Sequence, residues 1–345
     1  MKALTHPKGE DEVLLNIYDI ATKAGVSIAT VSRVLNGSPN VRAKTKEKVL
    51  CVINEEGYTP NVFARGLNLN TMKMIGILCT DVSDIYYAKA VSVIENALRQ
   101  YGYDSLLCST GNKLGDKQKY IDLLLAKRVD ALILIGSTFK EESDNSHIEK
   151  AASKVPTIIV NGLIDVPNTY CITCDEYTAM YDNVVALIKK GCHNILYLYD
   201  VESYSGMQKL NGYRAALKDC GLPAPSTLAL KVDKEPATIE ESLIDFISKG
   251  IPFSAILASE DLLAISAMHV LYKKGYKIPE DIPVIGFNNS LLCECSMPKL
   301  TSVDNMVDTL CNTAVNVLRD VFDNKTVTSK MTLSAKLVER DTFRL

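Results

Sequence analysis

The residues with the clearest chemistry lie in one segment, between Tyr18 and Gly37. Apolar residues at helical spacing predict a short helix, after which Gly25 permits a tight turn into a second short helix. Val26 would fill the space between the helices, and Ser27 is placed to cap the second helix by accepting a backbone N–H. This layout is that of a helix-turn-helix, whose second helix fits the major groove of DNA.

The second helix carries side chains of the types that contact DNA. Ile28 and Ala29 are small or apolar and can meet thymine methyl groups, while Arg33, one turn later, can reach a guanine or a phosphate. Short polar contacts would come from Ser27, Thr30, Ser32 and Asn36. Spacing alone also fits an ordinary three-helix bundle with an exposed helix, so the residue string itself has to distinguish the two.

The charge distribution supports a nucleic-acid partner. Residues 1–73 carry 10 Lys and Arg against 7 Asp and Glu, whereas the remainder carries 28 against 34. Between Val13 and Lys73 the counts are 8 basic and 4 acidic side chains. A surplus of this kind is what phosphate contacts require.

Other reactive residues form no recognisable catalytic or metal site. Cys171 and Cys174 are spaced as a CxxC pair, but they fall in a strand-like segment, where residues three apart point to opposite faces. Cys293 and Cys295 lie in an expected loop, and no second CxxC completes a four-thiolate site. The histidines are scattered at His6, His147, His193 and His269. Without a phosphate-binding glycine loop or a Gly-x-Ser-x-Gly turn, we expect no enzyme activity, no metal and no cofactor.

Length and composition predict a soluble protein of two or three folded units. The 345 residues are 47% hydrophobic and 23% charged, and no apolar run reaches the roughly 18–20 residues of a membrane helix. The first 14 residues resemble a disordered tail and lack a secretory signal, which favours a cytoplasmic location. We therefore interpret the ten cysteines as free thiols.

The pattern of elements changes once along the chain. Short helices broken by turns predict a helix-turn-helix headpiece over residues 15–60, followed by a linker over residues 61–73. From residue 74 to 345, apolar strands alternate with amphipathic helices, which predicts an α/β core of parallel sheets covered by helices. The expected strands are Ile75–Cys79, Ser105–Cys108, Ala131–Ile135, Thr157–Val160, Ile195–Leu198, Ala255–Leu257 and Pro283–Ile285.

The headpiece string resembles that of the LacI/GalR family of bacterial transcription repressors. The shared residues run Tyr18-Asp19-x-Ala21-x-x-Ala24-Gly25-Val26-Ser27-x-x-Thr30-Val31-Ser32-Arg33-Val34-x-Asn36, and the likeness extends over about 330 residues. The resemblance implies a sequence-specific DNA-binding regulator, with a repressor role, that binds a palindromic operator as a homodimer or tetramer. It adds further expected DNA contacts at Tyr18, Thr45, Tyr58 and Asn61.

The resemblance also implies that the linker contains a hinge, from Asn61 to Asn68, which in relatives folds as a helix when two subunits lie together on operator DNA. Ala64 and Leu67 would contact DNA, and Leu67 occupies the place of the leucine that wedges into the minor groove. Gly66 weakens a free helix by up to about 1 kcal/mol relative to Ala, although it also fits a tolerated surface residue.

In the core, the strings Ile75-Gly76-Ile77 and Val284-Ile285-Gly286-Phe287 are similar to the same family. They imply two Rossmann-like lobes, like those of periplasmic sugar-binding proteins, with chain crossings near Thr173, Thr301 and Leu333. The N-lobe would comprise about 74–173 and 302–332, and the C-lobe about 174–301 and 333–345. An effector cleft is expected between the lobes, at the carboxyl ends of the strands.

Six residues match effector-contacting positions of relatives. Tyr86 and Tyr87 would stack on a sugar or a base, or else pack in the core. Ser205 and Lys209 lie near the start of a helix expected to end at Gly212-Tyr213, and Lys209 replaces the usual arginine. The remaining two are Asp261 and Asn288.

Asp261 matches an acid that binds ligand hydroxyls or ring nitrogens in relatives, although an acid also suits the start of a helix. Glu260 stands where Asn is usual, and Asn288-Asn289 where acids are frequent. The effector is therefore expected to be a sugar, a sugar derivative, or a nucleoside or base, and to depart from a standard neutral sugar.

Two other functions remain open from the residues. The core alone also fits an exported solute-binding protein, but that class carries a signal peptide in place of a headpiece. The string Ala64-Arg65-Gly66-Leu67 and the pair Ile28-Ala29 are similar to catabolite-control-type regulators, whose corepressor is a phosphocarrier protein. The direction of the effector's action on DNA binding is not visible in the sequence.

Overall fold

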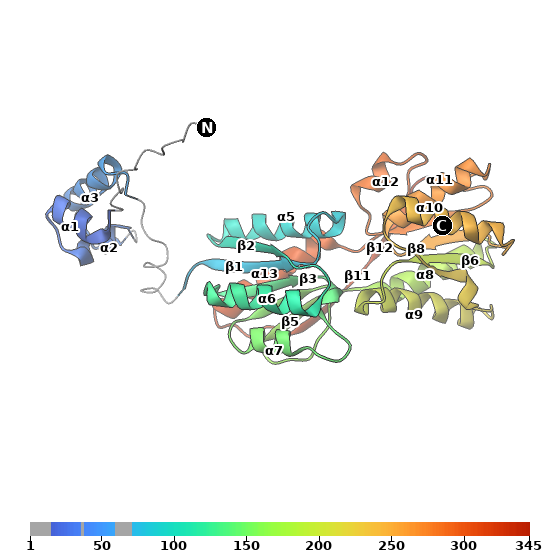
Figure 1. Ribbon diagram of the computed structural model, residues 1–345, viewed down its shortest axis with the longest axis horizontal. Helices are drawn as coiled ribbons and strands as arrows, with labels where there is room; N and C mark the ends of the chain where they lie inside the picture. The colour runs from blue at the N-terminus through green and yellow to red at the C-terminus, as the bar shows by residue number, and fades with distance from the viewer. Residues whose placement is uncertain (1–14, 36–37, 59–70) are drawn as a thin grey trace, which may run out of the picture. The chain divides into compact units, whose positions relative to one another are not determined.

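The computed structural model describes residues 15–35, 38–58 and 71–345. The chain divides into two compact units that meet between Met72 and Lys73. The predicted tail (residues 1–14) and the predicted hinge (residues 61–68) lie outside the described residues. Figure 1 shows the helices and strands of both units.

The first unit is a small helical domain, with helices α1 (Ile17–Ala24), α2 (Ile28–Leu35) and α3 (Ala43–Glu55). Its core contains Ile20, Ala24, Val31, Val34 and Val49. Gly25 has a φ of 59°, and the Ser27 Oγ accepts a hydrogen bond from the Thr30 N–H at 3.2 Å. The predicted turn and cap of the helix-turn-helix are thereby confirmed.

The N-lobe of the second unit is a six-stranded parallel sheet with strand order β11-β5-β4-β3-β1-β2. Helices cover both faces of the sheet, as Figure 1 shows in cyan and green. The strands are β1 (Met74–Cys79), β2 (Asp104–Ser109), β3 (Ala131–Ile135), β4 (Thr157–Val160), β5 (Thr169–Asp175) and β11 (Lys330–Ser334). The helices are α5 (Ile85–Gln100), α6 (Leu114–Ala126), the 3-10 turn η1 (Ser137–Phe139), α7 (Ser146–Ala152) and α13 (Val307–Phe322).

The C-lobe repeats this architecture with strand order β12-β10-β9-β8-β6-β7, in which only the edge strand β12 is antiparallel among the described pairings. Its strands are β6 (Ile195–Tyr199), β7 (Ala229–Lys231), β8 (Ala255–Ala258), β9 (Val284–Phe287), β10 (Thr301–Asp304) and β12 (Lys336–Val338). Its helices are α8 (Glu176–Lys189), α9 (Tyr204–Asp219), η2 (Ser226–Leu228), α10 (Pro236–Ser248), α11 (Asp261–Lys273) and α12 (Leu291–Cys295). The prediction of two Rossmann-like lobes is confirmed.

The chain crosses between the lobes at three places. It leaves the N-lobe after β5 ends at Asp175, returns between Asp304 and Val307, and leaves again near Ala335 between β11 and β12. The second crossing comes later than the expected Thr301, because β10 pairs with β9 of the C-lobe before α13 packs on α5 of the N-lobe. Each of the three crossings is only a few residues long.

The cysteine expectations have different outcomes. Cys171 and Cys174 lie on β5 and face opposite sides of the N-lobe sheet, since they belong to different buried clusters. The expected separation of the CxxC pair is confirmed. The expectation of a loop at Cys293 and Cys295 was wrong, because both lie in the short helix α12, where Cys293 is buried.

Close packing of α8 on α9 depends on a glycine. A Cβ atom at Gly212 would lie 2.3 Å from the backbone oxygen of Tyr177 on α8. Helix α9 also runs on to Asp219, past the end expected at Gly212-Tyr213, because Tyr213, Ala216 and Leu217 continue its buried face. Gly212 is therefore an interior contact point of the helix.

We predict that Gly212→Ala lowers the free energy of unfolding by about 1–3 kcal/mol, because the added methyl group forces the two helices apart. Gly115→Ala is the matched control, since no atom lies within 4 Å of its added Cβ in α6. That control should stabilise by up to about 1 kcal/mol through helix propensity. Urea unfolding of both variants measures this, and equal stabilities would contradict the packing role of Gly212.

Candidate functional site

The predicted DNA-contacting residues of the first unit lie mainly on its surface. Tyr18 is 64% exposed and Ile28 is 39% exposed. Ser27, Ala29 and Arg33 are exposed as well. Partly buried are Thr30, Ser32, Thr45 and Tyr58. Asn36, Asn61, Ala64 and Leu67 lie outside the described residues.

One face of α2 is available to a partner. Val31 and Val34 point into the core of the unit, so Ala29 and Arg33 are carried on the outward side of the helix, while Ile28 lies at the edge of the buried face and is 39% exposed. Basic side chains at the start of α3 are also exposed: Arg42, Lys44, Lys46 and Lys48. The unit therefore presents an exposed helix together with a positive surface, which is what binding to a DNA backbone requires.

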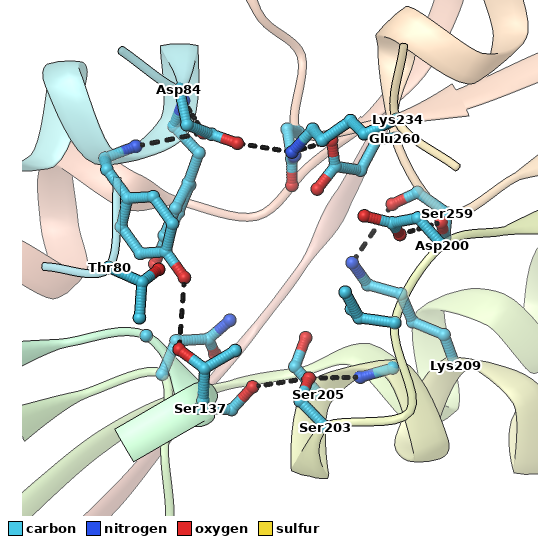
Figure 2. Close-up of a pocket in the computed structure, with 18 of the residues that line it drawn as sticks. Thr80, Asp84, Ser137, Asp200, Ser203, Ser205, Lys209, Lys234, Ser259 and Glu260 are labelled. Atoms are coloured by element: carbon cyan, nitrogen blue, oxygen red, sulfur yellow. Dashed lines mark hydrogen bonds and ion pairs between the residues drawn. The ribbon is translucent and has the colours of Figure 1, made fainter. Parts of the chain in front are cut away.

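The second unit contains a cavity between its lobes, with about 870 Å³ of space that is partly open to solvent. Figure 2 shows its side chains pointing from both lobes into the shared space. The lining residues follow β1, β3, β6, β8 and β9, at the ends Thr80, Gly136, Asp200, Ser259 and Asn288. All five positions are carboxyl ends of strands, where ligands of α/β sheets bind.

The tyrosine pair of the cavity is held by a helix cap. Asp84 caps α5, its carboxylate accepting the Tyr86 N–H at 2.8 Å and the Tyr87 N–H at 3.3 Å. The two rings meet edge to face with centroids 5.5 Å apart. Gly136, with φ of 104°, leaves room for Tyr87, because a Cβ there would lie 2.6 Å from the Tyr87 Oη. Both rings also pack on the N-lobe core, so they line the cavity and support it.

The same Asp84 carboxylate reaches across the cavity. It forms an ion pair with Lys234 of the C-lobe, and Lys234 also pairs with Glu260 at 2.5 Å. Both contacts are partly buried, the Lys234 side chain being 38% exposed and that of Glu260 20% exposed. Lys234 therefore joins an N-lobe helix cap to the end of a C-lobe strand (Figure 2).

A second contact joins the lobes on the other side of the cavity. The Ser137 Oγ of the N-lobe donates to the Ser203 Oγ of the C-lobe at 2.9 Å. Ser203 is itself the cap of α9. Next to it, the Lys140 ammonium of the N-lobe lies 5.3 Å from the ring centroid of Tyr204. Two helix caps, Asp84 of α5 and Ser203 of α9, thus make contacts between the lobes.

Lys209 forms the buried floor of the cavity. Its ammonium donates to the Ser259 carbonyl at 3.1 Å and lies 3.6 Å from Glu176. It also lies 4.1 Å from the centre of the Phe287 ring. Asn161 of the N-lobe donates to the same Glu176 carboxylate at 3.1 Å. Ser205, the other residue predicted on α9, lines the cavity nearby.

Asp261 and Asn288 occupy different surroundings. Asp261 is 2% exposed and does not line the cavity described above. Its carboxylate accepts the Ser290 N–H at 2.7 Å and the Ser302 hydroxyl at 2.5 Å, while burial raises its pKa. Asn288 lines the cavity and accepts a hydrogen bond from Asn305 at 2.9 Å. The ligand role of Asp261 stays a prediction.

Sequence reasoning did not single out Asp84, Lys234, Glu176 and Asn305. A cap signal was present at Asp84, which directly precedes the helical segment from Ile85. No sequence signal identified Lys234, because it lies in a loop between β7 and α10 and its N-lobe partner is 150 positions away.

Two polar atoms at the cavity have no hydrogen-bond partner in the described parts of the chain. They are the Oδ1 of Asn305, a residue that is 1% exposed, and the Oη of Tyr86. A buried polar group without a partner is costly, typically by about 1–3 kcal/mol. Both atoms are themselves buried, so they face the protein interior and are not exposed to the cavity.

Comparisons with known proteins agree for both units. Residues 16–61 match the model of bacterial regulatory proteins of the lacI family, and residues 72–317 match periplasmic binding proteins and the sugar-binding domain of the LacI family. An HTH-type transcriptional regulator of Lachnoclostridium phytofermentans is 50% identical, covering 95% of this chain and 99% of the relative. Catabolite control protein A of Priestia megaterium is 31% identical, covering 96% and 98%.

A solved structure of a Lac repressor dimer bound to operator and the anti-inducer ONPF has a TM-score of 0.84 at 25% identity. It covers 95% of this chain and 98% of that one. A helix-turn-helix unit joined to a two-lobed core with a cleft defines a class of DNA-binding regulators. The chain belongs to the LacI family and is a DNA-binding transcriptional regulator.

The described helices include none long and apolar enough to cross a bilayer. No cluster of three or more metal-ligating side chains occurs in residues 15–35, 38–58 or 71–345.

The pKa of Glu260 provides a test of the cavity's electrostatics. Burial, with the Asp200 charge second, raises this pKa from 4.5 to about 7, although Lys234 opposes the shift. The protonated form of Glu260 therefore stabilises the fold. This contribution is fully present below about pH 4.5 and is lost as the pH rises through 7.

We predict that the Tm of the wild type falls relative to that of Glu260→Gln between pH 4.5 and 7.5. The exposed control Glu149→Gln should track the wild type, and parallel pH curves for Glu260→Gln would contradict the raised pKa.

Proposed function

We propose that the protein is a repressor that binds a palindromic operator as a homodimer and responds to a small-molecule effector in the cavity between its lobes. The observation that carries the proposal is the presence, in one chain, of an exposed second helix in a helix-turn-helix unit and of a cavity lined by both lobes of the core. Protein symmetry would match operator symmetry, with one α2 helix in each of two major grooves.

The cleft supports a control mechanism based on lobe arrangement. Contacts that join the lobes at the cavity include the ion pair of Asp84 with Lys234 and the hydrogen bonds of Ser137 with Ser203 and of Asn161 with Glu176. A ligand that favours one arrangement of the lobes changes the population of that arrangement by its difference in affinity. If the linker transmits this change to the headpiece, effector binding alters the affinity for DNA. Coupling free energies between two such sites are usually about 1–3 kcal/mol.

The C-lobe offers a surface for a second copy of the chain. Tyr272 is 81% exposed and Met297 is 91% exposed, and both line one groove together with Met268, Ile278 and Pro298. Large apolar side chains at this exposure mark association surfaces. A similar protein, the Lac repressor, forms a dimer on its operator. We propose that this groove is part of the homodimer interface; a tetramer or a phosphocarrier corepressor would need additional surfaces.

Selection from a randomised duplex library tests the DNA-binding proposal directly. The selected sites should be pseudo-palindromes whose half-sites place two headpieces one helical turn or a multiple apart. Sites without internal symmetry would contradict binding as a dimer.

We predict that Arg33→Ala weakens discrimination at one base position by about 1–3 kcal/mol if the side chain reads a base, and lowers the salt slope by about 1 if it contacts a phosphate. Fluorescence anisotropy with a selected site at several salt concentrations separates these roles. Affinity and salt slope both equal to those of the wild type would exclude Arg33 from the interface.

We predict that Leu67→Ala weakens operator binding while leaving the melting of the core unchanged, because the wedge contact to the minor groove is lost. Unchanged operator affinity would remove the proposed wedge role from Leu67.

We predict that the double substitution Tyr272→Glu and Met297→Glu converts the dimer to a monomer, because charges cannot be buried in an apolar interface. Sedimentation velocity measures the mass. The control is Leu123→Glu on α6, a leucine that is 43% exposed on the N-lobe. A variant that stays dimeric would place the interface elsewhere.

A further inference from the structure

The chain enters the core through a residue with an unusual backbone conformation. Lys73 is the first residue of the second compact unit, and its φ is 51°. The β-carbon of a side chain disfavours this left-handed conformation, so a lysine keeps it only where the surrounding contacts hold it. Lys73 therefore forms a specified turn of the chain, directly before β1 begins.

Backbone hydrogen bonds hold the chain at this turn. The Asp104 N–H, at the start of β2, donates to the Lys73 carbonyl at 2.8 Å. The Met74 N–H donates to the Asp130 carboxylate at 3.1 Å, and the Asp130 N–H donates to the Met74 carbonyl at 2.8 Å. Two neighbouring segments of the N-lobe thus fix the backbone on the core side of the turn.

The side chain of Lys73 is held by an aromatic pair. Its ammonium lies 4.4 Å from the centroid of the Tyr103 ring and donates to the Tyr103 hydroxyl oxygen at 3.3 Å. The Tyr103 ring stacks on Phe322, with centroids 5.5 Å apart and an interplanar angle of 24°. Both rings pack against the N-lobe core, and the face of an aromatic ring attracts a cation. Lys73, Tyr103 and Phe322 are called here the junction cluster.

Three elements connect the junction cluster with the cavity between the lobes. Strand β1 begins directly after the turn and leads to Thr80 at the cavity. Helix α5 begins after its cap Asp84 at the cavity and ends shortly before β2. Helix α13 begins two residues after Asn305 at the cavity, and its last residue is Phe322. All three elements run along the N-lobe in Figure 1, so each of them reaches from the cavity to the far end of this lobe.

The two helices of this set pack on each other and are also joined by polar contacts. In their first turns Lys89 pairs with Asp308 at 2.9 Å. At their other ends the Arg319 guanidinium donates to the Tyr101 hydroxyl at 3.1 Å, and this hydroxyl donates to Asn316 at 3.3 Å. Closely packed elements move as bodies and deform little. A displacement of the helices at the cavity therefore displaces the junction cluster as well.

We propose that Lys73 and Tyr103 are positioning residues for DNA binding. The junction cluster fixes the direction in which the chain passes between the core and the linker, and it thereby sets the spacing of operator half-sites that the dimer prefers. A junction without this contact samples more directions, because fewer dihedral angles are restrained, so more spacings are tolerated. This inference rests on the proposed function, in which a homodimer binds a palindromic operator.

Operators with one base pair added to or removed from the centre of a selected site test the proposal on the full chain. The measured quantity is the spacing preference, defined as the dissociation constant of the altered site divided by that of the selected site. The wild type should show a preference of tenfold or more. Lys73→Met removes the cation and Tyr103→Leu removes the ring, and each should lower the preference at least threefold. The double variant should equal the singles, because the same contact is lost each time.

Conservative variants and a matched pair serve as controls. Lys73→Arg and Tyr103→Phe keep a cation over an aromatic ring, so they should keep the wild-type spacing preference. Lys119→Met removes the same charge from another lysine–tyrosine pair, in which the Lys119 ammonium lies 5.8 Å from the ring centroid of Tyr120 on α6. This variant should also keep the wild-type preference. Melting curves establish that each variant is folded, and Lys73→Met changes an exposed residue, so it tests the proposal even if Tyr103→Leu destabilises the core.

The salt dependence of operator binding distinguishes positioning from a direct contact with DNA. Loss of a lysine that contacts a phosphate lowers the salt slope by about 1. A positioning role for Lys73 predicts that Lys73→Met keeps the slope of the wild type while its spacing preference falls.

Three results would overturn the proposal. These are a spacing preference lowered less than threefold in Lys73→Met, an equal loss of preference in Lys119→Met, or a lower salt slope in Lys73→Met with the preference unchanged. In each case a wild type that prefers one spacing of a symmetric site still supports the proposed function. A wild type that selects no symmetric site would instead overturn the proposed function, and this inference with it.

Discussion

The ion pair of Lys234 with Asp84 joins the two lobes at the cavity between them, and Glu260 holds the same lysine from the C-lobe. Asp84 also caps α5 and thereby fixes Tyr86 and Tyr87 at the cavity wall. One carboxylate thus orders an N-lobe helix, positions two aromatic rings and binds the C-lobe. Because the cap and the ion pair share the Asp84 carboxylate, a change in one alters the other, and energies within such a network are not additive.

The two sheets determine where the cavity lies, and helix caps make contacts between the two lobes that line it. Parallel strands bring five loops together at their carboxyl ends, and Asp84 and Ser203 cap helices that start in those loops. Contacts made by caps are short and directional, so they hold one particular spacing of the lobes. Each of the three chain crossings between the lobes is only a few residues long. The angle between the lobes can therefore change when the contacts made by the caps change.

Much of the fold could be predicted because its signals are local. The string around Gly25 and Ser27 specifies a turn and a cap, and apolar runs such as Ala131–Ile135 identify buried strands. The expected strands did not include β7, β10, β11 and β12; along the edge strand β11, for example, exposed and partly buried residues alternate, so no apolar run marks it. The position of β10 depended on pairing with β9, a contact between distant residues. Tyr86, Tyr87, Ser205, Lys209 and Asn288 do line the cavity between the lobes, whereas the partners that link the lobes could not be read from spacing.

We propose that the arrangement of the lobes, to which the Asp84–Lys234 ion pair contributes, sets the affinity of the headpiece for DNA. The most direct test is the dissociation constant of a selected operator for Asp84→Asn, Lys234→Met and the double variant, measured without effector. We expect a change of at least about fivefold in the same direction for all three, with the double variant equal to the singles, because the same ion pair between the lobes is lost each time. Operator affinities within twofold of the wild type for all three folded variants would contradict it.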